Sequence, residues 1–124
     1  MIDLHSHTTA SDGTDAPEEL VARAVALGLE ALAITDHDTF SGYEQALPHA
    51  KSAALELLCG IELSTRHMGK TVHLLGYFFM APPTRQFQDW VIFMQQSRRE
   101  RNVKLAAKLR TAGIEIETDL ILRQ

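Results

Sequence analysis

The chain has 124 residues, 45% of them apolar and 23% charged, which corresponds to one globular domain or to part of a larger one. The net charge of −4 argues against a DNA-binding module, and no apolar run approaches the roughly 20 residues that cross a bilayer. The N-terminus lacks the pattern of a signal peptide, so we expect a cytoplasmic protein. The single cysteine, Cys59, excludes an internal disulfide and lies in "LELLCGIEL", where a buried core residue is expected rather than a reactive thiol.

Hydrophobic patterning predicts alternating strands and helices in the first two thirds of the chain. In chain order these are a strand over 2–5, a helix over 17–28, a strand over 29–35, a helix over 42–54, a strand over 55–63 and a strand over 71–79. We expect Ser41 to cap the second helix and Pro48 to kink or break it. The short "RHMGK" allows a hairpin between the last two strands.

The last third of the chain has a different character. Residues 84–112 contain no Gly or Pro and predict a long helix that ends at Gly113. A short extended piece and a further helix starting at Thr118 or Asp119 are expected to follow. The alternation of elements indicates an α/β fold with a largely parallel sheet covered on both faces, in which reactive residues gather at the carboxyl ends of strands.

Histidines and carboxylates recur at or near one end of each predicted strand. Imidazole and carboxylate bind divalent ions such as Zn²⁺, Mn²⁺ and Fe²⁺, and two such ions can clamp a phosphoryl group and activate water. His5 and His7 point to the same side of an extended segment, and Glu62 can bridge two ions through its two oxygens. The predicted metal ligands are His5, His7, Asp12, His37, Glu62 and His73.

Each of these pieces has a simpler interpretation when it is taken alone. A lone His-x-His pair is usually coincidental, and a strand histidine such as His73 is more often a core residue. Their recurrence on four strands favours metal binding. We interpret Asp36 and Asp38 as hydrogen-bond partners that orient imidazoles or coordinated water, and helix capping is an equal alternative for Asp38. Two further histidines, His49 and His67, are interpreted as surface residues.

Four segments, "DLHSHTTASDGT", "ITDHDTFSG", "GIELS" and "VHLLGYF", resemble successive motifs of the PHP (polymerase and histidinol phosphatase) domain family. The "RRERNVKLAAKLRTAGIEI" segment is similar to the family's small stand-alone phosphoesterases, which include phosphatases of nucleoside 3′,5′-bisphosphates and 5′-to-3′ exoribonucleases. The resemblance implies a distorted, seven-stranded TIM-like β/α barrel with two or three divalent ions. His5 and His7 would bind one ion and Asp12 and His37 another, with Glu62 bridging and His73 completing part of a site.

The chain departs from the family pattern because no histidine follows His73, whereas the family uses a further histidine and an Asp-x-His pair. We therefore expect an N-terminal part of a longer protein, with the first half of the barrel at 1–82 and the start of a truncated helical insertion or cap at 83–124. The remainder of the barrel, or another chain, would complete the fold. The fragment itself is expected to be inactive.

Six of the twelve Lys and Arg residues fall between Arg98 and Arg110. On a helical projection, Arg98 and Arg101 interrupt an apolar stripe. One interpretation is that their stems cover the core while the guanidinium groups reach water. The other is that they grip substrate phosphate through bidentate hydrogen bonds, and the two are equally supported.

The sequence therefore predicts a metal-dependent phosphoesterase that hydrolyses phosphate esters of nucleotides or short RNA by metal-activated water. No catalytic residue beyond the metal ligands is predicted, and Ser6 and Ser11 are expected to have minor hydrogen-bonding roles. The alternatives are a histidinol-phosphate phosphatase and a non-catalytic, metal-stabilised structural module.

Overall fold

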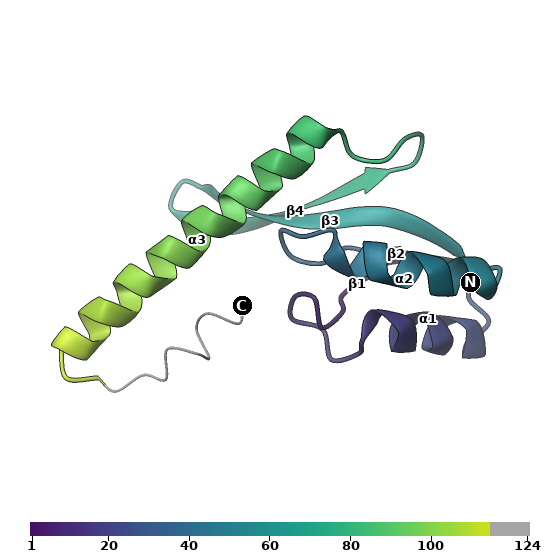
Figure 1. Ribbon diagram of the computed structural model, residues 1–124, viewed down its shortest axis with the longest axis horizontal. Helices are drawn as coiled ribbons and strands as arrows, with labels where there is room; N and C mark the ends of the chain where they lie inside the picture. The colour runs from purple at the N-terminus through teal and green to yellow at the C-terminus, as the bar shows by residue number, and fades with distance from the viewer. Residues whose placement is uncertain (115–124) are drawn as a thin grey trace. The chain divides into compact units, whose positions relative to one another are not determined.

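The computed structural model describes residues 1–114, which contain four strands and three helices (Figure 1). They fall into two compact units, Met1–Thr84 and a second unit that starts at Arg85. The elements are β1 (Ile2–Ser6), α1 (Pro17–Ala26), β2 (Ala31–Ile34), α2 (Ser41–Ser52), β3 (Glu56–His67), β4 (Lys70–Phe78) and α3 (Arg85–Thr111). The helix predicted to start at Thr118 or Asp119 lies outside the described residues.

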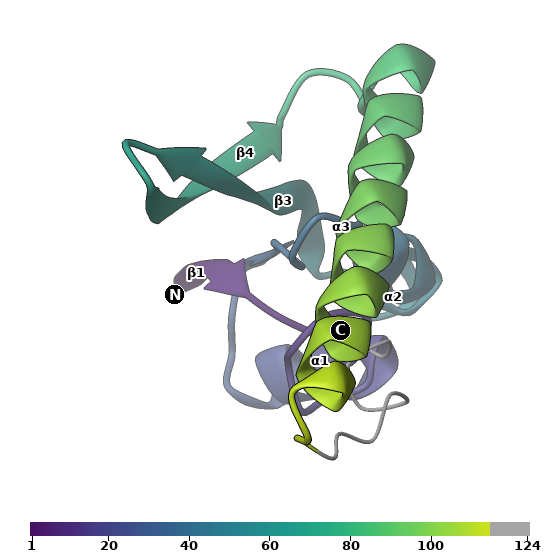
Figure 2. The same cartoon turned by 90° about the vertical axis from the view of Figure 1, so that its left-hand side faces the viewer.

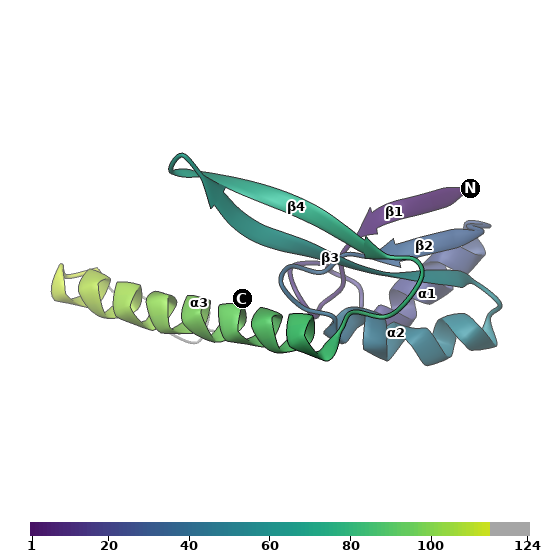
Figure 3. The same ribbon diagram turned by 90° about the horizontal axis from the view of Figure 1, so that it is seen from above.

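The four strands form one sheet in the order β1-β2-β3-β4. The strands β1, β2 and β3 are parallel, and β4 returns antiparallel to β3 (Figure 3). Met68 and Gly69 connect β3 to β4 with positive φ angles of 49° and 79°, as a tight two-residue hairpin turn requires. The mixed α/β class is confirmed, and the hairpin that the sequence allowed is the one observed.

The core of the first unit lies between the sheet and the helices α1 and α2, which cover the same face (Figure 3). Its buried members come from β2, from both helices and from the residue before β3: Val21, Ala24, Leu32, Ile34, Ala46, Ala50 and Leu55. On the opposite face Ile2 and Leu75 remain exposed. Both helices of this unit therefore pack on one face. The expected coverage of both faces holds for β2, all of whose residues are buried, and not for β1 and β4, which are largely exposed.

The sheet curls so that its two outer strands approach each other. The Tyr77 hydroxyl, on β4, donates a hydrogen bond of 2.7 Å to the carbonyl oxygen of Leu4, on β1. In the sheet, β2 and β3 lie between β1 and β4, so a flat sheet would hold β1 and β4 too far apart for a hydrogen bond. The curl agrees with part of a barrel wall, while the seven-strand count stays a prediction.

The structure corrects two local expectations about α2, that Pro48 breaks the helix and that Ser41 caps it. Pro48 lies inside the helix and does not end it, and Ser41 is the first helical residue rather than the cap, which is Phe40. Ala46 and Ala50 are buried in the core on either side of the proline. Their tertiary packing stabilises a helix that has lost one backbone donor at Pro48.

The second unit contains the long helix α3, which confirms the helix predicted over 84–112 to within a residue at each end. Gly113 follows it with a φ of 80°, the left-handed conformation that commonly ends a helix. Within the described residues, no helix combines the length and the apolar character that crossing a membrane requires. The interpretation of this unit as a cap or insertion stays a prediction.

Burial of Cys59 on β3 predicts an unreactive thiol. The side chain is 4% exposed, and desolvation raises its pKa to about 11, with a further contribution from Glu44. This rise in the thiol pKa lowers the thiolate fraction at pH 8 by about a hundredfold relative to an ordinary cysteine. We expect iodoacetamide to alkylate the folded chain at least that much more slowly than the urea-unfolded chain, followed by mass spectrometry. Equal rates in the two states would contradict the buried position.

Candidate metal centre

The strand β1 brings two histidines to one carboxylate. His5 lies in β1, and His7 follows one residue beyond its end. The Nε2 atom of His5 lies 2.8 Å from Oε2 of Glu62, and the Nε2 atom of His7 lies 3.1 Å from the same oxygen. Both imidazoles therefore reach the same side of the sheet, the geometry that residue alternation in an extended segment produces.

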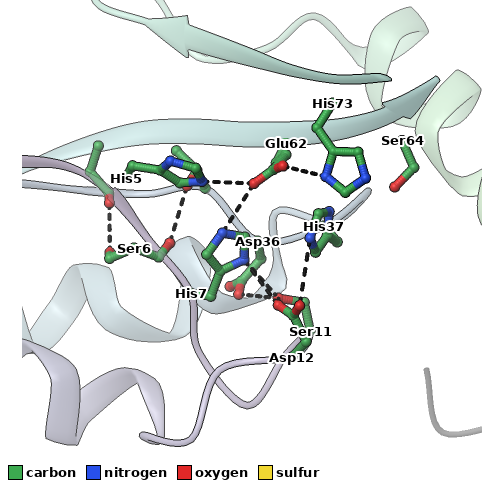
Figure 4. Close-up of polar contacts among 12 residues, drawn as sticks. His5, Ser6, His7, Ser11, Asp12, Asp36, His37, Glu62, Ser64 and His73 are labelled. Atoms are coloured by element: carbon green, nitrogen blue, oxygen red, sulfur yellow. Dashed lines mark hydrogen bonds and ion pairs between the residues drawn. The ribbon is translucent and has the colours of Figure 1, made fainter. Parts of the chain in front are cut away.

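Glu62 is the buried centre of this group, with a side chain that is only 7% exposed (Figure 4). Its second oxygen, Oε1, lies 2.5 Å from Nδ1 of His73 on β4. His73 is paired with Ser64, two residues from Glu62, so the two side chains are diagonal neighbours on one face of the hairpin. The prediction that Glu62 ends its strand is wrong, because β3 continues to His67 as one arm of that hairpin.

Asp12 and His37 extend the group beyond Glu62. The loop after β1 places Asp12 Oδ1 at 3.1 Å from His7 Nδ1 and Oδ2 at 3.6 Å from His37 Nε2. His37 follows β2 and forms an isolated parallel bridge with Glu62, which sets it beside the carboxylate. Figure 4 shows these side chains converging from β1, its following loop, the segment after β2, β3 and β4.

The electrostatics of the group favour an ionised Glu62. Burial by itself raises the pKa of Glu62, but hydrogen bonds from His5 and His73 and the charges of His37 and His5 outweigh it and lower the pKa. The four imidazole rings lie in a row, with successive centroids 5.1, 4.9 and 4.8 Å apart. A buried carboxylate surrounded by nitrogen donors requires protons on the imidazoles or cations between them to balance its charge.

The donor set fits divalent cations. Three overlapping groups have ligand atoms within 4.8 Å of one another: His5, His7 and Glu62; His7, Asp12 and His37; and His37, Glu62 and His73. Among the described side chains, the buried nitrogen Nδ1 of His37 has no hydrogen-bond partner. Buried polar atoms are nearly always paired, so the chemistry of this group leaves room for a partner that the described side chains do not supply. The other ring nitrogen of His37, Nε2, is the one that faces Asp12.

The two additional aspartates hold the segments that carry the candidate ligands, and their role in orienting imidazoles or coordinated water stays a prediction. Asp36 is fully buried and accepts hydrogen bonds from Thr8 and Ser11, the latter lying 3.5 Å from His7 Nδ1. Asp38 accepts a 2.8 Å bond from the backbone N–H of Ser64, so it joins the segment after β2 to β3. The cap residue of α2 is Phe40, and the capping alternative for Asp38 stays a prediction.

The remaining candidates are distributed as follows. Arg98 and Arg101 lie on α3, three residues apart and so on one side of that helix. His49 and His67 are exposed, in line with their interpretation as surface residues. Sequence reasoning missed Thr8, which is fully buried and anchors the loop after β1. A threonine in a polar loop carries no pattern that would have revealed this role.

Comparison with known proteins gives consistent relatives. A 5′-3′ exoribonuclease of Haemophilus influenzae is 42% identical over 113 residues, covering 90% of this chain and 40% of the relative. A 3′,5′-nucleoside bisphosphate phosphatase of Chromobacterium violaceum is 34% identical, covering 91% and 39%. Among solved structures, a Bifidobacterium adolescentis protein provisionally assigned as a metal-dependent phosphoesterase aligns with a TM-score of 0.79 at 29% identity, covering 99% and 43%.

The chain thus spans about two fifths of the length of the relatives it matches. Its similarity to them extends through both units, because each alignment covers nine tenths or more of the chain. The family model of the PHP domain matches residues 3–114, which include every histidine and carboxylate of the cluster around Glu62. On this match and the two curated relatives, the chain belongs to the PHP domain family.

Proposed function

We propose that this chain supplies the metal-binding part of a phosphoesterase that hydrolyses phosphate esters of nucleotides or short RNA. The observation that carries the proposal is the buried Glu62 carboxylate, whose two oxygens contact three imidazoles while Asp12 links two of the four. The relatives with exoribonuclease and nucleoside bisphosphate phosphatase names support a substrate of this class. The complete activity belongs to a longer protein that carries this chain.

The proposed division of labour follows the contacts. His5, His7 and Glu62 would hold one cation, Asp12 and His37 would hold a second, Glu62 would bridge the two, and His73 would complete part of the site. When bound, divalent cations at such a site neutralise phosphoryl oxygens and lower the pKa of water. Glu62 holds the two groups of donors in fixed positions, because the residues before and after it in β3 are paired with β4. Burial raises the pKa of Glu62, and the hydrogen bonds of His5 and His73 with the charge of His37 lower it below its ordinary value.

Substitution of the central carboxylate tests the metal assignment. We expect the 124-residue chain to bind Mn²⁺ in isothermal titration calorimetry, and Glu62→Gln to weaken binding by at least about tenfold because a bridging anionic ligand is lost. At a Mn²⁺ concentration of 100 times Kd, binding should add about 2.7 kcal/mol to the free energy of unfolding. Glu30→Gln is the matched control, since that exposed carboxylate pairs with the N-terminal amine. Equal Mn²⁺ affinity in both variants would contradict the assignment.

Substrate preference separates the proposed activity from its alternatives. In the longer protein, we expect a nucleoside 3′,5′-bisphosphate or a 5′-phosphorylated oligoribonucleotide to be turned over at least about tenfold faster than histidinol phosphate, because phosphoesterases discriminate through contacts to the group beyond the phosphate. A chelator should abolish the release of inorganic phosphate or nucleotide, and added Mn²⁺ should restore it. Faster turnover of histidinol phosphate would favour the phosphatase alternative, and metal binding without any turnover would favour a structural module.

The two arginines on α3 provide a test of phosphate binding. If Arg98 and Arg101 grip a substrate phosphate, the double alanine variant of the longer protein should raise KM for a nucleoside bisphosphate by at least about tenfold with little change in kcat, because charged hydrogen bonds contribute about 1.5–3 kcal/mol. The double variant Arg99→Ala and Lys104→Ala is the matched control, with the same loss of charge from the same helix. Equal KM values in the two double variants would leave only the solvent-facing interpretation.

A further inference from the structure

Asp36 carries three hydrogen bonds although none of the candidate ligand groups includes it. Its Oδ1 accepts from the backbone N–H of Thr8 at 2.7 Å and from the hydroxyl of Ser11 at 2.7 Å. Its Oδ2 accepts from the hydroxyl of Thr8 at 2.8 Å. Both Asp36 and Thr8 are fully buried. A buried carboxylate is retained only with such compensation, so these bonds hold the loop after β1 firmly against the end of β2.

The loop held in this way is the one that positions ligands. The carbonyl oxygen of Thr8 accepts from the N–H groups of Ser11 and Gly13 at 3.0 and 2.9 Å, which closes the turn around Asp12. The Ser11 oxygen lies 3.3 Å from Asp12 Oδ1 and 3.5 Å from His7 Nδ1. Ser11 therefore stands between the buried carboxylate on one side and two candidate ligands on the other (Figure 4).

The positions of the protons determine which atoms donate and which accept in these contacts. The shortest contact of the Ser11 hydroxyl is the 2.7 Å hydrogen bond that it donates to Asp36 Oδ1, so the hydroxyl proton lies in that bond. The Ser11 oxygen then faces His7 with its lone pairs, and Asp12 Oδ1 faces the same ring nitrogen at 3.1 Å. Two acceptors at Nδ1 favour the His7 tautomer that carries its proton there, which leaves Nε2, the nitrogen nearest Glu62, free to bind a cation.

Gly42 provides the space for this arrangement. A Cβ atom at this second residue of α2 would lie 1.9 Å from Asp36 Oδ2 and 2.5 Å from the Thr8 hydroxyl oxygen. Both distances are far below van der Waals contact, and both neighbours are buried and bonded to each other. Any side chain at position 42 would therefore displace the carboxylate that holds the loop.

We propose that Asp36, Thr8, Ser11 and Gly42 form a buried clamp that sets Asp12 and the His7 tautomer in place before a cation arrives. Asp36 and Ser11 are then positioning residues of the metal centre, and the proposal rests on the proposed function. Preorganised ligands lose little conformational freedom on binding, so loss of the clamp lowers cation affinity without removing any ligand.

Ser11→Ala tests the clamp because Ser11 is only partly buried and its loss leaves Asp36 bonded to Thr8. For the 124-residue chain, we expect the Kd for Mn²⁺ by calorimetry to rise at least about tenfold, with the metal-free unfolding temperature changed by less than about 2 °C. Ser11→Thr, which keeps the hydroxyl, should restore the affinity. Ser6→Ala is the matched control, since Ser6 lies between the two histidines but donates to the carbonyl of Ala33.

The outcomes separate this inference from the proposed function. Mn²⁺ affinity in Ser11→Ala equal to that of the unaltered chain would overturn the clamp and leave the metal centre intact. Absence of Mn²⁺ binding by the unaltered chain would overturn both. A second variant, Gly42→Ala, should weaken Mn²⁺ binding at least as much as Ser11→Ala. Unchanged affinity in Gly42→Ala, together with a lower unfolding temperature, would show that position 42 serves packing alone and would also overturn the clamp.

Discussion

The structure of the first unit depends on how one carboxylate is buried. Glu62 lies among imidazoles from β1, from the residue following it, from the segment after β2 and from β4. Four separate parts of the chain therefore have to meet at one point, and the curl of the sheet, marked by the bond from Tyr77 to Leu4, is what allows β1 and β4 to approach it together. A carboxylate buried there without positive partners would destabilise the fold. The imidazoles, with the protons or cations that they hold, are therefore needed for folding as well as for the chemistry of the site.

Around this centre the hydrogen-bonded groups differ in burial. The outermost imidazoles, His5 and His73, are half exposed. Asp36 is fully buried, with backbone and hydroxyl donors bonded to it and α2 packed against it through a glycine. The positions of the candidate ligands are thus fixed from the buried side of the site, where water does not compete with the protein's own hydrogen bonds.

Sequence reasoning reached the class of fold and the residues that gather at the site because both follow from periodicity. Residues such as His5 and His37 mark where apolar runs end, and strand ends in an α/β fold meet at one edge. The path of β3 was not predictable in this way, since its polar half beyond Glu62 is supported only by the antiparallel partner β4. Pro48 was misjudged because tertiary packing of Ala46 and Ala50 outweighs a local preference. Thr8, Asp36 and Gly42 come from the loop after β1, the segment after β2 and α2. Their contacts depend on how these segments pack together, which no local sequence pattern predicts.

Every donor of the candidate centre belongs to the first compact unit, Met1–Thr84, and none of them lies on α3. Among the described residues, the three candidate ligand groups therefore include no side chain from the second unit. The relatives named exoribonuclease and nucleoside bisphosphate phosphatase each align over nine tenths of the chain, so both of them share the unit that holds these ligand groups.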